Sequence, residues 1–121
     1  MSHRPAQIAD VIRHAIAPML LTEIEHPANS ITSIVAVKVT PDLKHAIVWL
    51  AITPPEAVGV VYGRIRDAAK HLRFLLADHL HLPVMPDLRF RVDQSGGAVD
   101  GFNLLLNQIE RERSVDPSEP E

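Results

Sequence analysis

Cysteine is absent from the 121-residue chain. This absence excludes disulfide bonds, thiolate metal sites and cysteine nucleophiles together, and it fits a reducing compartment. Aromatic residues are also scarce, with three Phe, one Trp and one Tyr. A nucleic-acid interface built as a platform of stacked rings is therefore not expected, and we expect Trp49 and Tyr62 to serve packing rather than base stacking.

Long hydrophobic runs are lacking as well. The apolar stretch from Ala15 to Leu21 is interrupted by Pro18, and it is far shorter than the roughly 20 residues that a membrane span needs. No secretory signal is visible, so we expect a cytoplasmic protein with no membrane contact. Apolar residues make up 46% of the chain, enough for one folded domain, which we assign to residues 1–113.

Motifs for catalysis and metal binding are not found. No Gly-rich phosphate loop follows a predicted strand, and Ser95 has no obvious His or Asp partner near it in sequence. Among the seven histidines, His71, His79 and His81 lie closest together, and neither a carboxylate pair nor a cysteine completes a site. We therefore expect no enzymatic activity, no cofactor and no metal. His79 shares the apolar register of its helix, which predicts packing at the core or its rim.

Charge is distributed unevenly along the chain. The net charge is −3, yet residues 1–113 are formally neutral, with 12 basic and 12 acidic residues. From Tyr62 to Arg91 there are six Lys and Arg against three Asp, and such a local positive field can bind phosphate even in an acidic chain. Residues 114–121 carry three acids and two prolines, which predicts a disordered acidic tail.

Hydrophobic periodicity predicts the element order α-β-β-α(α)-β-α, with one or two helices between the second and third strands. A helix over residues 7–24 should kink or break at Pro18, because proline removes a backbone donor. Strands over 31–40 and 45–53 are joined by the turn Thr40-Pro41-Asp42-Leu43-Lys44. A long helix should begin with the capping-box spacing of Thr53 and Glu56 and run unbroken to about Leu80.

Alternation along the strands predicts which side chains face the core. One face of the first strand carries Val35, Val37 and Val39, one face of the second carries Ala46, Val48, Leu50 and Ile52, and the inner face of the third carries Leu88, Phe90 and Val92. Ile47 and Trp49 lie on the other face, and a final helix carries Phe102, Leu105, Leu106 and Ile109. A crossover of roughly 30 residues makes parallel pairing available to the third strand. The fold class is therefore α+β, with a small mixed sheet and helices on one face.

Several short sequence motifs follow one another along the chain. They are Arg4-Pro5-x-x-Ile8-Ala9, Val37-x-Val39-Thr40-x-Asp42-Leu43-x-x-Ala46-x-Val48, Leu72-Arg73, and Pro86-Asp87-Leu88-x-Phe90-x-x-Asp93-x-Ser95. Together they resemble the ribosome-binding factor A family over roughly residues 4–110. The resemblance implies a single type II KH-like domain with a three-stranded sheet, α-β-β-α-(kink)-α-β, followed by a C-terminal helix.

The resemblance also implies a function and the place of a kink. A member of this family is expected to be a non-enzymatic, RNA-binding maturation factor. It would associate with the free small (30S) ribosomal subunit, assist late 16S rRNA processing and 30S assembly, be monomeric when free, and be linked to growth in the cold. The family's kink, Ala-x-Gly, corresponds to Ala68-Ala69-Lys70. Because glycine permits backbone excursions that lysine resists, we expect either a shallower kink or two merged helices.

Basic residues gather at this expected kink. At 100° per residue, Arg66, Lys70 and Arg73 form a stripe whose charged ends should face solvent, and the resemblance assigns the stripe to ribosomal RNA. Arg89 and Arg91 either extend this surface or keep an edge strand soluble, whereas Lys38 and Lys44 are interpreted as ordinary surface lysines. The full set of RNA-binding candidates is Arg64, Arg66, Ala68, Ala69, Lys70, His71, Arg73, Arg89 and Arg91.

Two other interpretations stay open. For the stripe alone, the alternative is a solvated helix face whose charges pair with neighbours such as Asp67. For the whole protein, the alternative is an adaptor or dimerisation domain that uses its sheet face without binding RNA. Salt dependence separates RNA binding from the adaptor, because phosphate contacts weaken steeply with salt and an apolar interface does not.

Overall fold

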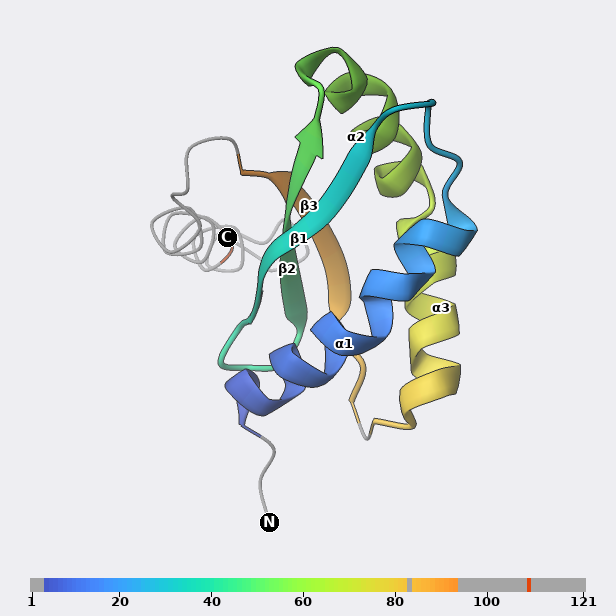
Figure 1. The fold of residues 1–121 in the computed structure, drawn as a ribbon. Helices are drawn as coiled ribbons and strands as arrows, with labels where there is room; N and C mark the ends of the chain where they lie inside the picture. Colours follow the sequence, from blue (N-terminus) through green and yellow to red (C-terminus); the bar gives the residue numbers. More distant parts are fainter. Residues whose placement is uncertain (1–3, 83, 94–108, 110–121) are drawn as a thin grey trace, which may run out of the picture.

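A three-stranded sheet carries three helices on one face in the computed structural model, which describes residues 4–82, 84–93 and 109 (Figure 1). The elements are α1 (Pro5–Glu23), β1 (Ile31–Val39), β2 (His45–Thr53), a 3-10 turn (Pro55–Ala57), α2 (Val58–Asp67), α3 (Ala69–Leu80) and β3 (Asp87–Val92). β2 lies in the middle, antiparallel to β1 and parallel to β3. The predicted α+β class, the mixed sheet and the KH-like arrangement are confirmed.

The main core fills the space between the sheet and the helices. The helices contribute Ile8, Ile12, Ile16 and Leu20 from α1, Val61 and Ile65 from α2, and Leu72 and Leu76 from α3. The strands contribute Val37, Val39, Ala46, Val48, Leu50, Ile52, Leu88 and Phe90. Each fully buried side chain of this size stabilises the fold by about 1.5–3 kcal/mol relative to exposure. The predicted inner faces of β2 and β3 are therefore confirmed.

The opposite face of β2 is covered as well. Ile47 and Trp49 form a second apolar cluster with Ile109, and Ala36 packs against it. Trp49 is only 4% exposed, so its predicted packing role is confirmed. Ile109 is the one described residue of the predicted final helix, and it is helical and buried. The other residues predicted for that helix, and the predicted tail at 114–121, lie outside the described residues.

A β-bulge changes the pattern in β1. The register with β2 shifts between Ile34 and Ala36, so that Ile34 pairs with Leu50 and Ala36 with Trp49. Ile34 therefore packs against the main core, while Val35 is 38% exposed. The prediction that Val35 shares an inner face with Val37 is wrong, because the extra residue of a bulge reverses the alternation beyond it.

Side chains of the hairpin turn hold β1 and β2 in register. The Thr40 hydroxyl donates to Asp42 Oδ1 (2.6 Å), and the same carboxylate accepts from the Lys44 backbone N–H (3.1 Å). The His45 N–H donates to Thr40 Oγ1 (3.1 Å). Leu43 closes the turn with a positive φ of 64°. The turn predicted from the residues Thr40 to Lys44 is confirmed, and Thr40 and Asp42 are the residues that satisfy its backbone donors.

The first helix is not broken at proline. α1 is one helix with Pro18 inside it, on an exposed position. At its start, the Arg4 N–H donates to Gln7 Oε1 (3.3 Å) and Pro5 occupies the first turn, where a missing N–H costs little. Of the two outcomes predicted for Pro18, a kink or a break, the break into two pieces is therefore wrong, because core contacts of Ile16 and Leu20 on either side of Pro18 keep both halves on the sheet. The kink stays a prediction.

The crossover holds two helices rather than one. A 3-10 turn with Pro54 as its N-cap replaces the expected capping box of Thr53 and Glu56. α2 ends at Asp67 and α3 begins at Ala69, with Ala68 between them at φ −92° and ψ 4°. The unbroken helix that periodicity predicted is wrong, whereas the helix–kink–helix order that the resemblance implied is confirmed. Of the two outcomes left open for Lys70, a shallower kink or merged helices, merging is excluded. The junction keeps a negative φ, which alanine adopts freely, so it requires no glycine.

Candidate nucleic-acid interface

Basic residues from three elements meet beside the α2–α3 junction. Arg66 of α2, Lys70 and Arg73 of α3, and Arg89 of β3 line an open hollow of about 410 Å³. The remaining lining residues are Asp67, Ala69, Asp87 and Leu88. β3 is an edge strand of the described sheet, which lets the long Arg89 side chain reach the helices. The structure thus places Arg89 with the predicted stripe.

Arg66 and Lys70 are the solvent-facing cations of this hollow. The Arg66 side chain is 64% exposed, and its Nε lies 3.7 Å from Asp67 Oδ1. Its guanidinium also stands 5.8 Å from the centre of the Tyr62 ring, whose hydroxyl donates to the Phe90 carbonyl (2.9 Å). Such exposed contacts are worth little and exchange readily for a phosphate. Lys70 is exposed within α3.

Arg73 is engaged within the protein. Its Nη2 donates to the Met85 carbonyl (2.6 Å), and its Nε donates to the Pro86 carbonyl (3.2 Å). The same Nε lies 3.2 Å from Asp87 Oδ1. The expectation that all three charged ends of the stripe face solvent is therefore wrong for Arg73. Its guanidinium thus ties the connector before β3 to α3 by bonding two backbone carbonyls, groups that need a hydrogen-bond partner when water is excluded.

The other predicted site residues do not line the hollow. Arg64 Nη1 donates to the Glu25 carbonyl (2.6 Å), and His71 Nε2 lies 3.4 Å from Glu23 Oε1. Both side chains thus turn toward the end of α1 and the loop after it. Arg91 pairs in register with Trp49 and donates to the Phe90 carbonyl (3.3 Å). Ala68 forms the helix junction itself. Of the nine candidates, Arg66, Ala69, Lys70, Arg73 and Arg89 line the hollow.

The hollow is chemically suited to anions. Four of its lining residues are cationic and two, Asp67 and Asp87, are anionic. Asp87 was not among the sequence candidates, although it belongs to the motif Pro86-Asp87-Leu88. Its part is structural, because its carboxylate accompanies Arg73 and its N–H donates to the Lys44 carbonyl (2.9 Å). Close cations on one surface can contact successive phosphates of one strand.

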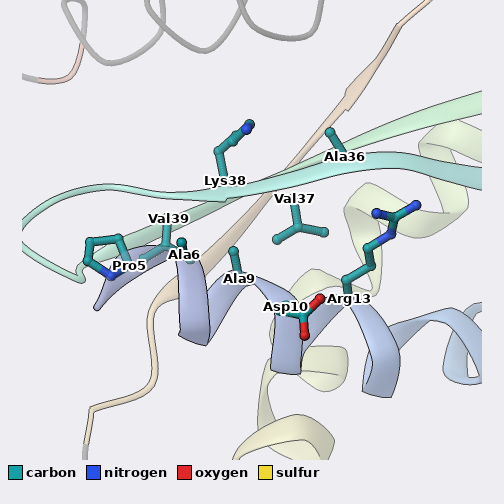
Figure 2. A pocket seen from close by; sticks show the side chains of 9 residues that line it. All are labelled: Pro5, Ala6, Ala9, Asp10, Arg13, Ala36, Val37, Lys38 and Val39. Atoms are coloured by element: carbon teal, nitrogen blue, oxygen red, sulfur yellow. The ribbon is translucent and has the colours of Figure 1, made fainter. Parts of the chain in front are cut away.

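A second hollow lies at the other edge of the sheet (Figure 2). It occupies about 380 Å³ between α1 and β1 and is lined by Arg13, Asp10 and Lys38 together with small apolar residues. Lys38, expected to be an ordinary surface lysine, is half-buried there, while Lys44 is exposed. Arg13 of α1 and Lys38 of β1 are thus two cations at the β1 edge of the sheet, and β2 separates that edge from β3.

Histidines do not gather into a metal site in the described part of the chain. No three His, Asp or Glu side chains within residues 4–82, 84–93 and 109 are placed to hold one ion. His79 is exposed, so its predicted packing is wrong. It lies in the last turn of α3, next to His81, which ends the helix in the left-handed conformation. Within the same described ranges, no helix has the length and apolar character needed to cross a membrane.

Comparison with known proteins identifies the family. The sequence matches the ribosome-binding factor A family over residues 4–106. It is 34% identical to ribosome-binding factor A of Thermomicrobium roseum, covering 97% of this chain and 92% of the relative, and 30% identical to that of Dechloromonas aromatica, covering 96% and 94%. The fold resembles the crystal structure of ribosome-binding factor A from Thermus thermophilus, with a TM-score of 0.64 at 17% identity, covering 77% of this chain and 100% of that one. The chain belongs to the ribosome-binding factor A family.

Proposed function

We propose that this protein is a non-enzymatic ribosome maturation factor that binds the free small (30S) subunit through its 16S rRNA. It assists late rRNA processing and subunit assembly by contact alone, with no bond made or broken. The observation that supports this role is the cationic hollow beside the α2–α3 junction, in a chain whose relatives are named ribosome-binding factors. The hollow receives backbone phosphates on Arg66, Lys70 and Arg89.

The arrangement of charge supports RNA rather than a protein partner. A stripe on an ordinary solvated helix would not continue onto a neighbouring strand, whereas here Arg89 of β3 joins Arg66 and Lys70. The rival interpretation, an adaptor that uses the sheet face, needs an open apolar surface there. In β2 the apolar residues of that face, Ile47 and Trp49, are already packed against Ile109. The hollow is therefore the better candidate for the functional surface.

Charge reversal of Arg66 and Lys70 to Glu tests the proposal. Both side chains are exposed, so the fold should be retained, and far-UV circular dichroism checks this. Cosedimentation with free small subunits at several salt concentrations should show much weaker binding. The plot of log affinity against log salt should flatten by about 0.7 to 0.9 per lost phosphate contact. Arg73 is left unchanged in this variant because its guanidinium also holds the connector before β3.

The matched control reverses Arg13 and Lys38, which changes the same number of charges at the opposite edge of the sheet. Lys44 is unsuitable as a control because its backbone lies against Asp87, a residue of the hollow, so a charge reversed at Lys44 would not be remote from the site. The control should bind nearly as the unmodified protein does. Equal losses in both variants would mean that binding responds to net charge alone, and binding insensitive to salt would favour the adaptor.

A further inference from the structure

Phe74 is an aromatic side chain left in solvent. It lies on α3 and is 67% exposed. Within the described ranges the other aromatic residues are packed: Trp49 and Phe90 are each 4% exposed, and half-buried Tyr62 donates its hydroxyl to a carbonyl. Among the aromatic side chains of the described residues, Phe74 is thus the one that lies mostly in solvent. A phenyl ring has no hydrogen-bonding group, so water gives it no compensation for that exposure.

The position of Phe74 on α3 relates it to the cationic hollow. It lies four residues after Lys70, which lines the hollow. Side chains at i and i+4 are neighbours on a helix, with Cβ atoms about 5–6 Å apart, and they point in directions only about 40° apart. A strand with a phosphate on Lys70 therefore brings the base of the same or the next nucleotide within reach of the Phe74 ring.

We propose that Phe74 stacks on one unpaired RNA base while the adjoining phosphates occupy the hollow. This inference rests on the proposed function and deepens it, because it specifies the ligand as a single-stranded segment. In a duplex both faces of each base are already stacked, whereas an unpaired base can turn outward onto a protein ring. A single ring accepts any base, since every base has a π-face. A single exposed ring is enough for this one stacking contact, although the chain has too few aromatic residues to build a platform of several rings.

The test uses the full chain and a set of single-stranded RNA 12-mers of mixed sequence, each with 2-aminopurine at one position. Stacking quenches 2-aminopurine fluorescence. The unmodified protein should quench at least one position, and Phe74→Leu should abolish that quenching and weaken binding about tenfold. Phe74→Trp should retain both signals. A duplex of the same sequence should bind more weakly and without quenching.

Phe74→Leu is the decisive variant because it keeps an apolar side chain and removes only the ring. If Phe74→Leu binds and quenches as the unmodified protein does, the stacking contact does not exist. If Phe74→Ala loses affinity while Phe74→Leu keeps it, the ring serves an apolar contact, and stacking is again refuted. Failure of the proposed function has a different signature: the unmodified protein then binds neither the RNA 12-mers nor small subunits, and stacking falls with it.

Discussion

At the scale of single residues, two arginines of the predicted stripe have different roles. Arg66 is exposed, with its guanidinium near Asp67 and the Tyr62 ring. Arg73, two helical turns away, donates to two carbonyls of the connector before β3. Helical spacing showed from sequence that both lie on one side of the crossover. It could not show which guanidinium bonds to the protein, because the acceptors are backbone atoms of residues 12 and 13 positions further along the chain.

Replacing Arg73 with Lys should separate the contribution of the guanidinium hydrogen bonds from that of the positive charge. Lysine keeps the positive charge near Asp87 but cannot donate two parallel bonds to Met85 and Pro86. We expect the free energy of unfolding to fall by about 1–2 kcal/mol, at the low end of the range for charged hydrogen bonds because the side chain is 41% exposed. Urea denaturation measures this change in the free energy of unfolding. Arg66→Lys is the control and should change stability by less than about 0.5 kcal/mol; equal stabilities would show that the Arg73 bonds contribute nothing.

At the scale of elements, periodicity predicted all three strands and the helices but missed two irregularities. The bulge at Val35 and the junction at Ala68 each interrupt a pattern whose apolar residues continue on both sides. Neither position carries glycine or proline, the usual signals of such interruptions. Both are decided by contacts with other elements: Ile34 is drawn into the core, and α2 and α3 each place two residues in it. The family resemblance located the junction, whereas the residues alone predicted one helix.

Lys70→Gly tests where the junction lies. Position 70 is inside α3, one residue beyond its first residue, Ala69. Glycine should therefore lower the free energy of unfolding, by up to about 1 kcal/mol, because it costs more backbone entropy in a helix than other residues do. The denaturant midpoint reports the sign. Lys70→Ala is the matched control and should be neutral or slightly stabilising. A stabilised glycine variant would place residue 70 in a left-handed kink rather than in α3.

At the scale of the whole molecule, the distribution of charge says more about RNA binding than the net charge does. A chain of net charge −3 concentrates Arg66, Lys70, Arg73 and Arg89 on one hollow. Sequence alone indicated the excess of positive charge between residues 62 and 91. It left open whether Arg89 extends that surface or only keeps an edge strand soluble, because the answer depends on how β3 pairs with β2 at the edge of the sheet. Long-range pairing of this kind leaves no local pattern in the sequence.

Deleting residues 114–121 tests how the acidic segment acts on the rest of the chain. The segment has almost no apolar surface to bury, so the melting temperature should change by less than about 5 °C, roughly 1 kcal/mol for a domain of this size. The deletion removes three carboxylates and makes the remaining chain formally neutral. Repulsion from RNA therefore decreases, and binding to small subunits should hold or strengthen at low salt. The slope of log affinity against log salt should stay the same, because it counts cations placed on phosphates and the deletion removes none.

A larger drop in melting temperature would show that the segment packs on the core. A loss of subunit binding would show that it contacts the ribosome directly, in which case the hollow is only part of the interface.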